Sequence, residues 1–427
     1  MKVKKKVVLW FLAGLATALV LTLIVVNLSL GEKKIERQLP RHFGSGDAQF
    51  QYEMGTLLGP PIIDGNRTQT LVNGDQIFPA MLEAIAAARQ TVTFESYIYW
   101  SGDIGKKFAD ALSDRAKAGV KVHVLLDWAG SQKMDAALLD ELKTSGVKLE
   151  RFHEPSWYHL GRMNNRTHRK LLVVDGKVGF TGGVGIAPLW EGNAQDEDHW
   201  RDTHFRSEGP VVAQMQSVFV DNWTKASGEV LHGAAYFPPL AKAGEQRSHM
   251  FSSSPSGGAE SMQLMYLMAI TAAEHSIDLS SAYFVPNQLT RNAMVKALRR
   301  GVKIRVIVPG PFTDADTVSN ASKANWDELL DAGGKIFEFQ PTMYHCKVMI
   351  LDGRMVSVGS TNFDQRSFSL NDEANLNVYD EAFAREQTRL FEQDLAKSRE
   401  FTAAMWHSRP AWDRLKERAA AMFSSQL

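Results

Sequence analysis

Residues 345–353 read HCKVMILDG, and residues 354–367 continue as RMVSVGSTNFDQRS. The first stretch predicts a buried β-strand that enters an Asp-Gly hairpin turn, and the second begins with a strand that leaves the turn. Because side chains two apart on a strand share a face, His345 and Lys347 are expected to point to one spot while Cys346 points away. An imidazole and an ammonium group would therefore meet on one face.

The same construction occurs earlier in the chain. Residues 168–176 read HRKLLVVDG, so the pattern H-x-K-x-x-x-x-D appears twice, beginning at His168 and at His345. The predicted strand GVKVHVLLD begins at Gly119 and has a counterpart, GVKIRVIVP, that begins at Gly301. The two histidines and the two glycines are separated by nearly equal lengths of chain. Two matching patterns at similar offsets predict one supersecondary unit that is used twice.

Helical and strand patterns alternate around both copies. Helices are expected over 75–90, 103–118 and 133–145 in the first copy and over 260–275, 289–300 and 322–332 in the second, with apolar strands between them. This order predicts an α/β fold of two similar α-β-α halves, each with a mixed sheet covered by helices. If a pseudo-twofold axis relates the halves, the two His-Lys strands meet at the seam and form one composite site.

The amino terminus has the pattern of a membrane anchor. Residues 1–6 read MKVKKK, and Val7 to Leu30 form an uncharged, mainly apolar run that is long enough for a helix to span a bilayer. We favour a retained single span of the bacterial inner membrane over a cleaved signal peptide or a lipoprotein-like leader, since the run continues into GEKKIERQ without a small-x-small site. Basic residues flank the run on both sides, so only a weak preference places the body outside the cytoplasm.

Five regions are expected along the chain. They are an anchor (1–30), a polar linker (31–73), the first half (74–240), the second half (241–404) and a C-terminal helix (405–427). In the C-terminal helix an apolar face that includes Trp412, Leu415 and Met422 could pack on the body or lie on a membrane, and packing is the commoner arrangement.

Composition excludes several classes of protein. The 48 Lys and Arg residues equal the 48 Asp and Glu residues, so overall charge does not favour nucleic acid as a partner. The single cysteine excludes an internal disulfide and a cysteine-based zinc cluster.

The paired motifs suit chemistry at phosphorus. A neutral imidazole can attack a phosphorus atom, and a protonated imidazole can deliver a proton to the leaving oxygen. Two lysines would stabilise the negative charge that accumulates on the phosphoryl oxygens. This chemistry needs neither a metal nor a cofactor, so His168, Lys170, His345 and Lys347 are the predicted catalytic groups.

The aspartates complete the catalytic motifs but fit a second role better. Asp175 and Asp352 have the wrong parity to share the His-Lys face, and each directly precedes a glycine. Support of the turn is therefore favoured over direct catalysis for both.

Further candidates follow each hairpin. In the second half, Ser360 and Asn362 are expected to bring a backbone N–H and an amide donor to a phosphate, and Glu373 to fix a histidine tautomer. In the first half, Gly183 takes the small position, and Asp202 could play the part of Glu373. The amide donor is absent there, because Gly185 stands at the same spacing from its histidine as Asn362 does from the histidine of the second half.

The duplicated H-x-K-x-x-x-x-D motif and the glycine-serine segment after it resemble the phospholipase D superfamily over roughly residues 75–401. Within it, the segments SYIYWSGDIG, GVKVHVLLDWAGS, HWRDTHFRSEGPVV and SSAYFVPN look like those of bacterial cardiolipin synthases. This resemblance implies a phosphatidyl-histidine intermediate, with His168 the expected nucleophile and His345 the acid. It also implies transfer of a phosphatidyl group between two phosphatidylglycerol molecules at a membrane.

Three alternatives stay open at this point. A phospholipase D hydrolase would use the same residues with water as the acceptor. A phosphodiesterase acting on nucleic acid is chemically possible, though the neutral charge and the predicted span argue against it. A non-catalytic membrane scaffold would be expected to lack one of the four His and Lys residues.

A basic cluster precedes the first motif. Arg162, Arg166 and Arg169 lie close behind Trp157 and Tyr158. This cluster is either a solvated surface or a mouth that meets anionic lipid headgroups.

Overall fold

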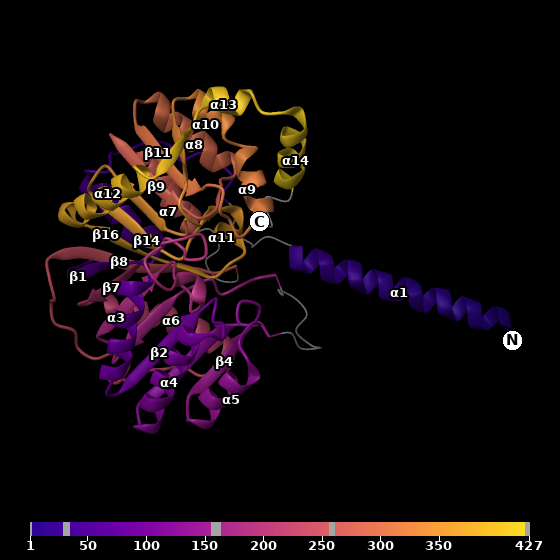
Figure 1. The fold of residues 1–427 in the computed structure, drawn as a ribbon, viewed down its shortest axis with the longest axis vertical. Helices are drawn as coiled ribbons and strands as arrows, with labels where there is room; N and C mark the ends of the chain where they lie inside the picture. The colour runs from indigo at the N-terminus through magenta and orange to yellow at the C-terminus, as the bar shows by residue number, and fades with distance from the viewer. Residues whose placement is uncertain (1, 29–34, 155–163, 256–260, 423–427) are drawn as a thin grey trace.

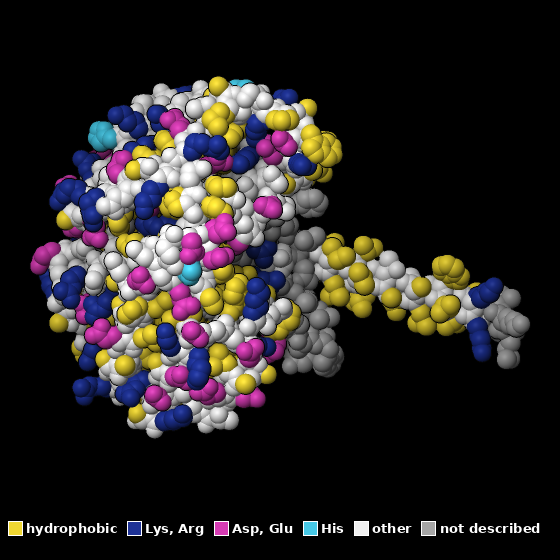
Figure 2. Space-filling model, in the orientation of Figure 1, with side chains coloured by type: hydrophobic (Ala, Val, Ile, Leu, Met, Phe, Trp, Pro, Cys, Tyr) yellow, Lys and Arg dark blue, Asp and Glu magenta, His cyan; other side chains and the backbone are white. Residues whose placement is uncertain are grey.

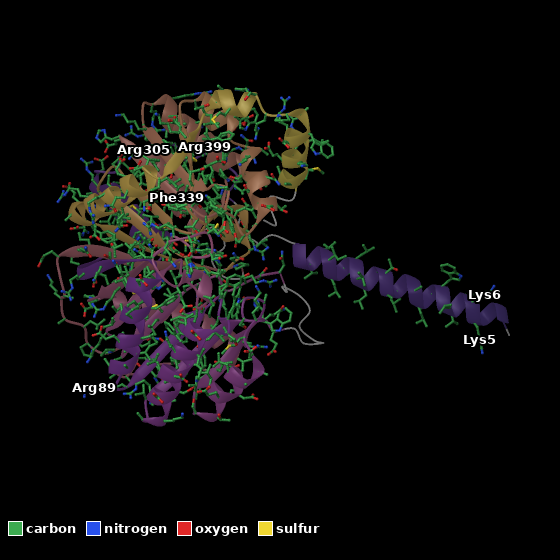
Figure 3. The ribbon with its side chains drawn as sticks, in the orientation of Figure 1. Lys5, Lys6, Arg89, Arg305, Phe339 and Arg399 are labelled. Atoms are coloured by element: carbon green, nitrogen blue, oxygen red, sulfur yellow. The ribbon has the colours of Figure 1, made fainter. Side chains whose placement is uncertain are left out.

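A computed structural model describes residues 2–28, 35–154, 164–255 and 261–422 of the chain. Its amino-terminal helix α1 (Lys2–Leu28) projects from the body, and its stretch from Lys5 to Val26 is long and apolar enough to cross a bilayer (Figure 1). Lys5 and Lys6 lie near the end of α1 that is far from the body (Figure 3). The last residues of the expected anchor, 29 and 30, lie outside the described residues.

The body consists of two halves of matching design, one above the other in Figure 1. In the first half the elements are β1 (Ile63–Val72), α3 (Asn73–Ala87), β2 (Thr91–Ser96), α4 (Asp103–Lys117), β3 (Lys121–Asp127), α5 (Ala136–Thr144), β4 (Lys148–Phe152), β5 (Leu171–Val174), β6 (Val178–Gly182), β7 (Thr203–Glu208) and α6 (Val211–Ser227).

The second half repeats this order with additions. Its elements are β8 (Gln246–Ser253), α7 (Ser261–Ala272), β9 (Ser276–Ser281), β10 (Phe284–Val285), α8 (Gln288–Arg299), β11 (Lys303–Pro309), α9 (Asp316–Lys323), α10 (Asp327–Asp331), β12 (Lys335–Phe339), β13 (Lys347–Leu351), β14 (Met355–Gly359), β15 (Phe363–Asp364), α11 (Gln365–Ser369), β16 (Glu373–Tyr379), α12 (Glu381–Leu395), β17 (Ser398–Phe401), α13 (Ala403–His407) and α14 (Ala411–Ala421).

Apart from β10 and β15, which pair with each other, the strands of both halves join in one sheet whose order is symmetric about its centre. The order is β4-β3-β2-β5-β6-β7-β1 in the first half and β8-β16-β14-β13-β9-β11-β12-β17 in the second, with β1 antiparallel to β8 at the join. Within each half the three strands β2-β3-β4 or β9-β11-β12 are parallel, and the hairpins β5-β6 and β13-β14 are antiparallel. The α/β class, the mixed sheet and the two similar halves are thus as predicted.

Helices cover both faces of the sheet. Apolar residues of α6 and α12, among them Met215 and Phe383, share one hydrophobic cluster with residues of β5 and β13 such as Leu171 and Ile350. Helices α3 and α4 cover the other face in the first half, and α7 and α8 cover it in the second. Because the shared cluster contains residues of both halves, its burial stabilises their association and not only each half.

The predicted linker is wrong in its second part. Helix α2 (Ala48–Leu58) packs on α7 through Phe50, Met54 and Leu58, and β1 forms the edge of the first half at the join. Strand β1 is rich in polar residues, whose side chains find hydrogen-bond partners within the sheet. Asn66 donates to the carbonyls of residues 63 and 246, and Thr68 forms a hydrogen bond with Ser207. Hydrophobic periodicity does not detect a strand of this kind.

Two further elements differ from the expectation. The single helix expected over 322–332 is two helices, α9 and α10, because the chain turns at the buried Trp326, whose indole N–H donates to Ser322 Oγ at 3.0 Å. Helix α14 packs beside α9, with Ala420 against Val318 and Ala321, and its Glu417 forms an ion pair with Arg409 at 2.6 Å. Its apolar face points outward, with Trp412 63%, Leu415 56% and Met422 81% exposed (Figure 2).

Candidate active site

The two histidines stand on extended segments that lead into the hairpins. Regular β5 begins at Leu171 and β13 at Lys347, so His168 and His345 precede their strands and do not lie inside them as predicted. The turns are as predicted: Asp175 and Gly176 have φ of 51° and 62°, and Asp352 and Gly353 have φ of 51° and 63°. These tight turns fix where each strand starts.

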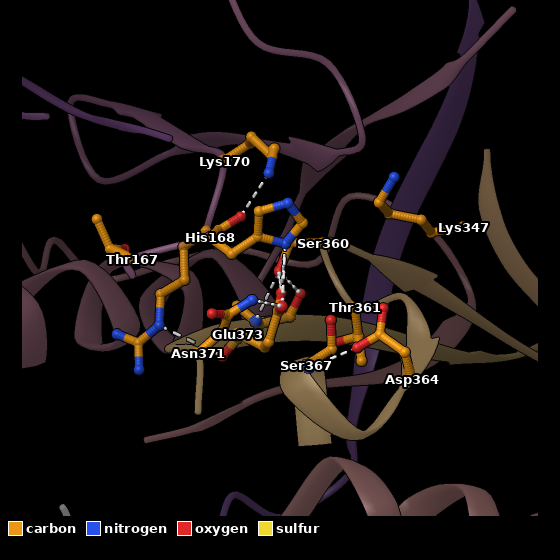
Figure 4. Close-up of polar contacts among 12 residues, drawn as sticks. Thr167, His168, Lys170, Lys347, Ser360, Thr361, Asp364, Ser367, Asn371 and Glu373 are labelled. Atoms are coloured by element: carbon orange, nitrogen blue, oxygen red, sulfur yellow. Dashed lines mark hydrogen bonds and ion pairs between the residues drawn. The ribbon is translucent and has the colours of Figure 1, made fainter. Parts of the chain in front are cut away.

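A carboxylate holds the ring of His168. Its Nδ1 lies 2.9 Å from Oε1 and 3.1 Å from Oε2 of Glu373 (Figure 4). Ser360 Oγ and Asn371 Nδ2 donate to the same carboxylate. Since a carboxylate only accepts hydrogen bonds, Nδ1 carries the proton and Nε2 keeps its lone pair.

His345 is held in the same way by a different carboxylate. Its Nδ1 lies 2.6 Å from Oδ2 of Asp202. That oxygen also accepts from the indole N–H of Trp190 at 3.1 Å, and the other oxygen accepts from the backbone N–H of Thr203 at 2.8 Å. The tautomer of both histidines is therefore set by a buried acid.

Each carboxylate comes from the opposite half. We expected Glu373 to hold the ring of His345, the histidine of its own half. Instead Glu373 holds His168, and Asp202 holds His345. The backbone explains this crossing: the N–H of His168 donates to the carbonyl of Asp372 at 2.9 Å, and the N–H of His345 donates to that of Arg201 at 2.8 Å. Neither histidine is thus positioned by one half alone, which makes the site composite.

Both lysines are buried beside their histidines. Lys170 Nζ donates to the carbonyl of His168 at 2.7 Å, and Lys347 Nζ donates to that of His345 at 2.9 Å. Burial, and then the charge of Lys347, lowers the pKa of Lys170 to about 7. Burial likewise lowers the pKa of Lys347. An anion placed between the two ammonium groups would relieve both effects, which is what a phosphate site requires.

Burial also keeps the imidazoles neutral. It lowers the pKa of His168 to about 4, with Glu373 opposing the shift, and it lowers the pKa of His345. Burial alone would raise the pKa of both partner acids, but His168 lowers that of Glu373 and His345 lowers that of Asp202. At neutral pH both rings are therefore neutral and both acids are ionised, while Lys170 lies close to its own pKa.

The two rings face one cavity of about 330 Å³. It is lined by His168, Lys170 and His345 together with Tyr97, Ile98, Arg166, Trp190, Trp200, Tyr283, Asp314, Val318, Asn362, Asp364, Arg366, Ser367 and Asn371. The amide oxygen of Asn362 is buried, and no described group bonds it. Amide oxygen and nitrogen can exchange places by rotation, so the cavity contains a polar group ready to bind a ligand.

Two of the small residues have other roles than predicted. The backbone N–H groups of Gly183 and Ser360 donate to the carbonyls of Thr203 and Ala374, so neither is available to a phosphate. A Cβ at Gly183 would lie 2.3 Å from the carboxylate of Asp202, so glycine makes room for that acid. Ser360 acts through its hydroxyl, which holds Glu373.

The motif aspartates do not reach the cavity. Asp175 accepts from the backbone N–H groups of residues 89, 90 and 91, and Asp352 accepts from those of residues 274, 275 and 276. Each ties its hairpin turn to the start of the neighbouring strand. As catalytic candidates they are corrected to structural supports, in line with their parity.

Sequence reasoning missed the four aromatic residues that line the cavity, Tyr283 and three that lie beside the histidines. Trp190 and Trp200 lie 5.4 and 5.2 Å from the ring of His345, and Tyr97 lies 5.1 Å from that of His168. The tryptophans lie between β6 and β7, Trp190 at the end of a single 3₁₀ turn, where no periodicity marks them. Tyr97 directly follows β2. Its position at the end of a central strand was the one feature of the sequence that could have marked it as a site residue.

The remaining candidates lie outside the site. Cys346 packs in the shared hydrophobic cluster on the other side of its segment, and burial raises its pKa to about 12. Among the described residues no group of three or more His, Cys, Asp or Glu side chains is arranged to hold a metal ion. Of the basic cluster, Arg169 is fully buried, Arg166 lines the cavity, and Arg162 lies outside the described residues, as do Trp157 and Tyr158.

Fold and site together define a class: two α/β halves that share one sheet and each bring a histidine to a common cavity, with a lysine buried beside each histidine. A family profile described as "Cardiolipin synthase, PLD-like domain" matches residues 81–197 and 266–395, one segment in each half. The solved structure of phosphatidylserine synthase from Haemophilus influenzae Rd KW20 covers 89% of this chain and 100% of its own, with a TM-score of 0.68 at 13% identity. At that identity the likeness concerns the fold alone.

Curated relatives narrow the class to one family. Cardiolipin synthase of Alkalihalophilus pseudofirmus is 31% identical over 93% of this chain and 79% of its own length. Cardiolipin synthase 2 of Bacillus anthracis is 33% identical over 84% of this chain and 70% of its own. The chain therefore belongs to the cardiolipin synthase family of phospholipase D-like proteins.

Proposed function

We propose that this protein forms cardiolipin by transferring a phosphatidyl group from one phosphatidylglycerol to another. The observation that carries the proposal is the composite cavity, in which two buried imidazoles from opposite halves face one space with their Nδ1 atoms held by acids. The kinship with cardiolipin synthases supports the choice of a phospholipid substrate and of transfer over hydrolysis.

The first step forms the covalent intermediate. Nε2 of His168 attacks the phosphorus of the donor, and the bond from phosphorus to the glycerol headgroup oxygen breaks. His345 gives that oxygen its proton, so free glycerol leaves and a phosphatidyl-histidine remains. The negative phosphodiester raises the pKa of His345 when it binds, which places the required proton on a ring that is neutral in the empty site.

The second step reverses the roles around the same phosphorus. The terminal hydroxyl of a second phosphatidylglycerol attacks, His345 takes its proton, and the P–N bond to His168 breaks. Cardiolipin leaves, and both rings return to their starting state. Lys170 and Lys347 stabilise the phosphoryl oxygens in both steps, because their charges lie in a site shielded from water.

His168 fits the nucleophile better than His345. Nε2 of His168 has no hydrogen-bond partner within the described part of the chain, whereas Nε2 of His345 lies 3.2 Å from Lys347 Nζ. An ammonium group beside a ring nitrogen competes for its lone pair, which disfavours attack on phosphorus from that ring.

The proposal includes the cellular location of the protein. Helix α1 would hold it at the membrane by a single span, where a lipid hydroxyl can compete with water for the intermediate. The catalytic body would lie outside the cytoplasm. Protease treatment of intact spheroplasts tests this: the body is digested if the proposed side is right and protected if it is wrong.

The direct test adds the purified full-length protein to phosphatidylglycerol liposomes and follows the products by mass spectrometry. Cardiolipin and glycerol are expected in equal amounts, with the His345→Asn variant as the control against a contaminating synthase. Phosphatidic acid as the main product would identify a hydrolase instead. Cleavage of an oligonucleotide without lipid turnover would identify a nuclease, and loss of activity on adding EDTA would contradict metal-free chemistry.

A further inference from the structure

Two arginines, one from each half, line the same cavity as the histidines. Arg166 stands two residues before His168, and Arg366 lies in the first turn of α11. Both side chains are half-buried. The proposed mechanism, which places one phosphodiester between the histidines and lysines, assigns neither of them a part.

The chain holds both guanidinium groups at fixed positions. Arg366 donates to the side-chain and backbone oxygens of Asn164, at 3.1 and 2.6 Å, and Arg166 donates to the carbonyl of Asn165 at 3.1 Å. Because Asn164 belongs to the first half and Arg366 to the second, this contact brings the two arginines together across the join.

Charge around the pair favours an anion. Burial and the neighbouring charge of Arg166 both lower the pKa of Arg366 from its ordinary value. Two nearby acids, Asp127 and Asp364, oppose this shift. The carboxylate of Asp127 accepts hydrogen bonds from the backbone N–H groups of residues 129, 130 and 167. Burial raises the pKa of Asp364 to about 7. Near neutral pH, Asp364 thus carries only part of a negative charge.

The chemistry of guanidinium groups identifies the anion. Arginine matches the oxygens of a phosphate with two parallel hydrogen bonds, and a buried guanidinium binds such an anion more strongly than an exposed one. In the proposed reaction, the acceptor lipid carries a phosphodiester of its own, separated from the attacking hydroxyl by one glycerol unit. The cavity must therefore hold two phosphates at once, while the histidines and lysines account for one.

We propose that Arg166 and Arg366 bind the phosphodiester of the acceptor lipid and thereby select an anionic phospholipid alcohol over water and over uncharged alcohols. This inference rests on the proposed function, since it assigns the acceptor side of the same transfer. It makes the pair a determinant of acceptor specificity and leaves bond cleavage to the histidines.

Two activities of the enzyme distinguish an effect on acceptor binding from an effect on the donor step. Cardiolipin formation needs a charged acceptor, whereas exchange of labelled free glycerol into phosphatidylglycerol uses the same donor step with an acceptor that has no phosphate. Arg166→Gln and Arg366→Gln should each lower cardiolipin formation about 10- to 100-fold, through a higher KM for phosphatidylglycerol as acceptor, while glycerol exchange changes less than about threefold. Arg366→Lys, which keeps the charge, should recover part of the loss.

Controls keep the outcomes distinct. The matched control is Arg354→Gln, which removes an exposed arginine at the β13–β14 turn and should change neither activity. An equal fall of both activities in the Gln variants would overturn the inference, and so would no fall in either. If wild-type protein exchanged glycerol but formed no cardiolipin, the proposed function itself would fail.

Free phosphate is the other source of the same anion. If the pair bound inorganic phosphate as an effector, millimolar phosphate would change the glycerol exchange of the wild type but not of the Gln variants, and cardiolipin formation would be equal in all of them. That pattern would overturn the assignment to a lipid. Unchanged thermal melting of the variants excludes misfolding as the cause of any loss.

Discussion

The two halves of the molecule share the same backbone plan and the same His-Lys pair and each present a histidine to one cavity, yet they surround their histidines differently. His168 has Tyr97 beside it and an acid that Ser360 helps to hold. His345 lies against two tryptophans and has an ammonium group 3.2 Å from its ring. Duplication of the fold thus supplies two imidazoles, and the neighbours that differ are the basis of the unequal tasks that we propose for them.

The crossing of the acids adds a second lesson. Because Glu373 and Asp202 each serve the histidine of the other half, neither half is competent by itself. Matched substitutions in the two halves therefore test whether His168 and His345 have equivalent or different roles.

Removal of either histidine should have the largest effect. His168→Ala and His345→Ala are each expected to lower cardiolipin formation by at least about 10³-fold, and the double variant by little more, since the two rings act as one unit. Initial rates on phosphatidylglycerol liposomes measure this. A folded single variant that kept the wild-type rate would show that its ring takes no part.

Substitution of the crossed acids should cost less. Glu373→Gln and Asp202→Asn keep the shape but remove the charge that fixes each tautomer, and a loss of about 10²- to 10⁴-fold is expected. Glu373→Gln should slow formation of the phosphatidyl-enzyme, in which His168 attacks, whereas Asp202→Asn should slow both that step and the attack of the acceptor, because His345 moves a proton in each. Pre-steady-state kinetics with quenched samples separate the two steps; the same pattern of effects on both steps in both variants would contradict distinct roles.

The pH profile of kcat/KM should report the same groups. His168 must be neutral to attack, so activity should fall as pH drops towards its pKa of about 4, and Lys170 must be charged, so activity should fall as pH rises through its pKa of about 7. Lys170→Arg, which stays protonated, should move the alkaline limb to higher pH. An alkaline limb that did not move would assign it to another group.

The residue between the histidine and the lysine differs between the two halves, and its substitution should change the free energy of unfolding by different amounts. In the first half it is Arg169, which is fully buried and bonds the carbonyls of Val218 and Ser253 and the carboxylate of Asp221. Arg169→Ala should lower the free energy of unfolding by about 3–5 kcal/mol, because buried acceptors lose their partner.

In the second half the same position is Cys346. Cys346→Ser should leave activity within about twofold of the wild type and cost about 1–3 kcal/mol for the buried hydroxyl. Denaturant titrations of both variants, beside the wild type, measure the stability changes. A Cys346→Ser protein that was stable but inactive would reopen the question of a thiol nucleophile.

Much of this architecture could be predicted from the sequence. The repeated motif indicated two like halves and a shared site, and the Asp-Gly turns and the parity of His345, Lys347 and Cys346 followed from local rules. The crossing of Glu373 and Asp202 could not be predicted, because spacing along the chain does not reveal which half an acid faces. Strand β1 and the paired tryptophans escaped for a related reason, since their partners are distant in sequence.

The most direct test of the central claim is to find which histidine carries the phosphatidyl group. The wild-type protein, quenched in acid-free denaturant after brief incubation with phosphatidylglycerol and digested for mass spectrometry, should yield a phosphatidyl adduct on the peptide that contains His168. The His168→Asn variant should yield none. An adduct on the peptide that contains His345, or none in the wild type, would contradict the account.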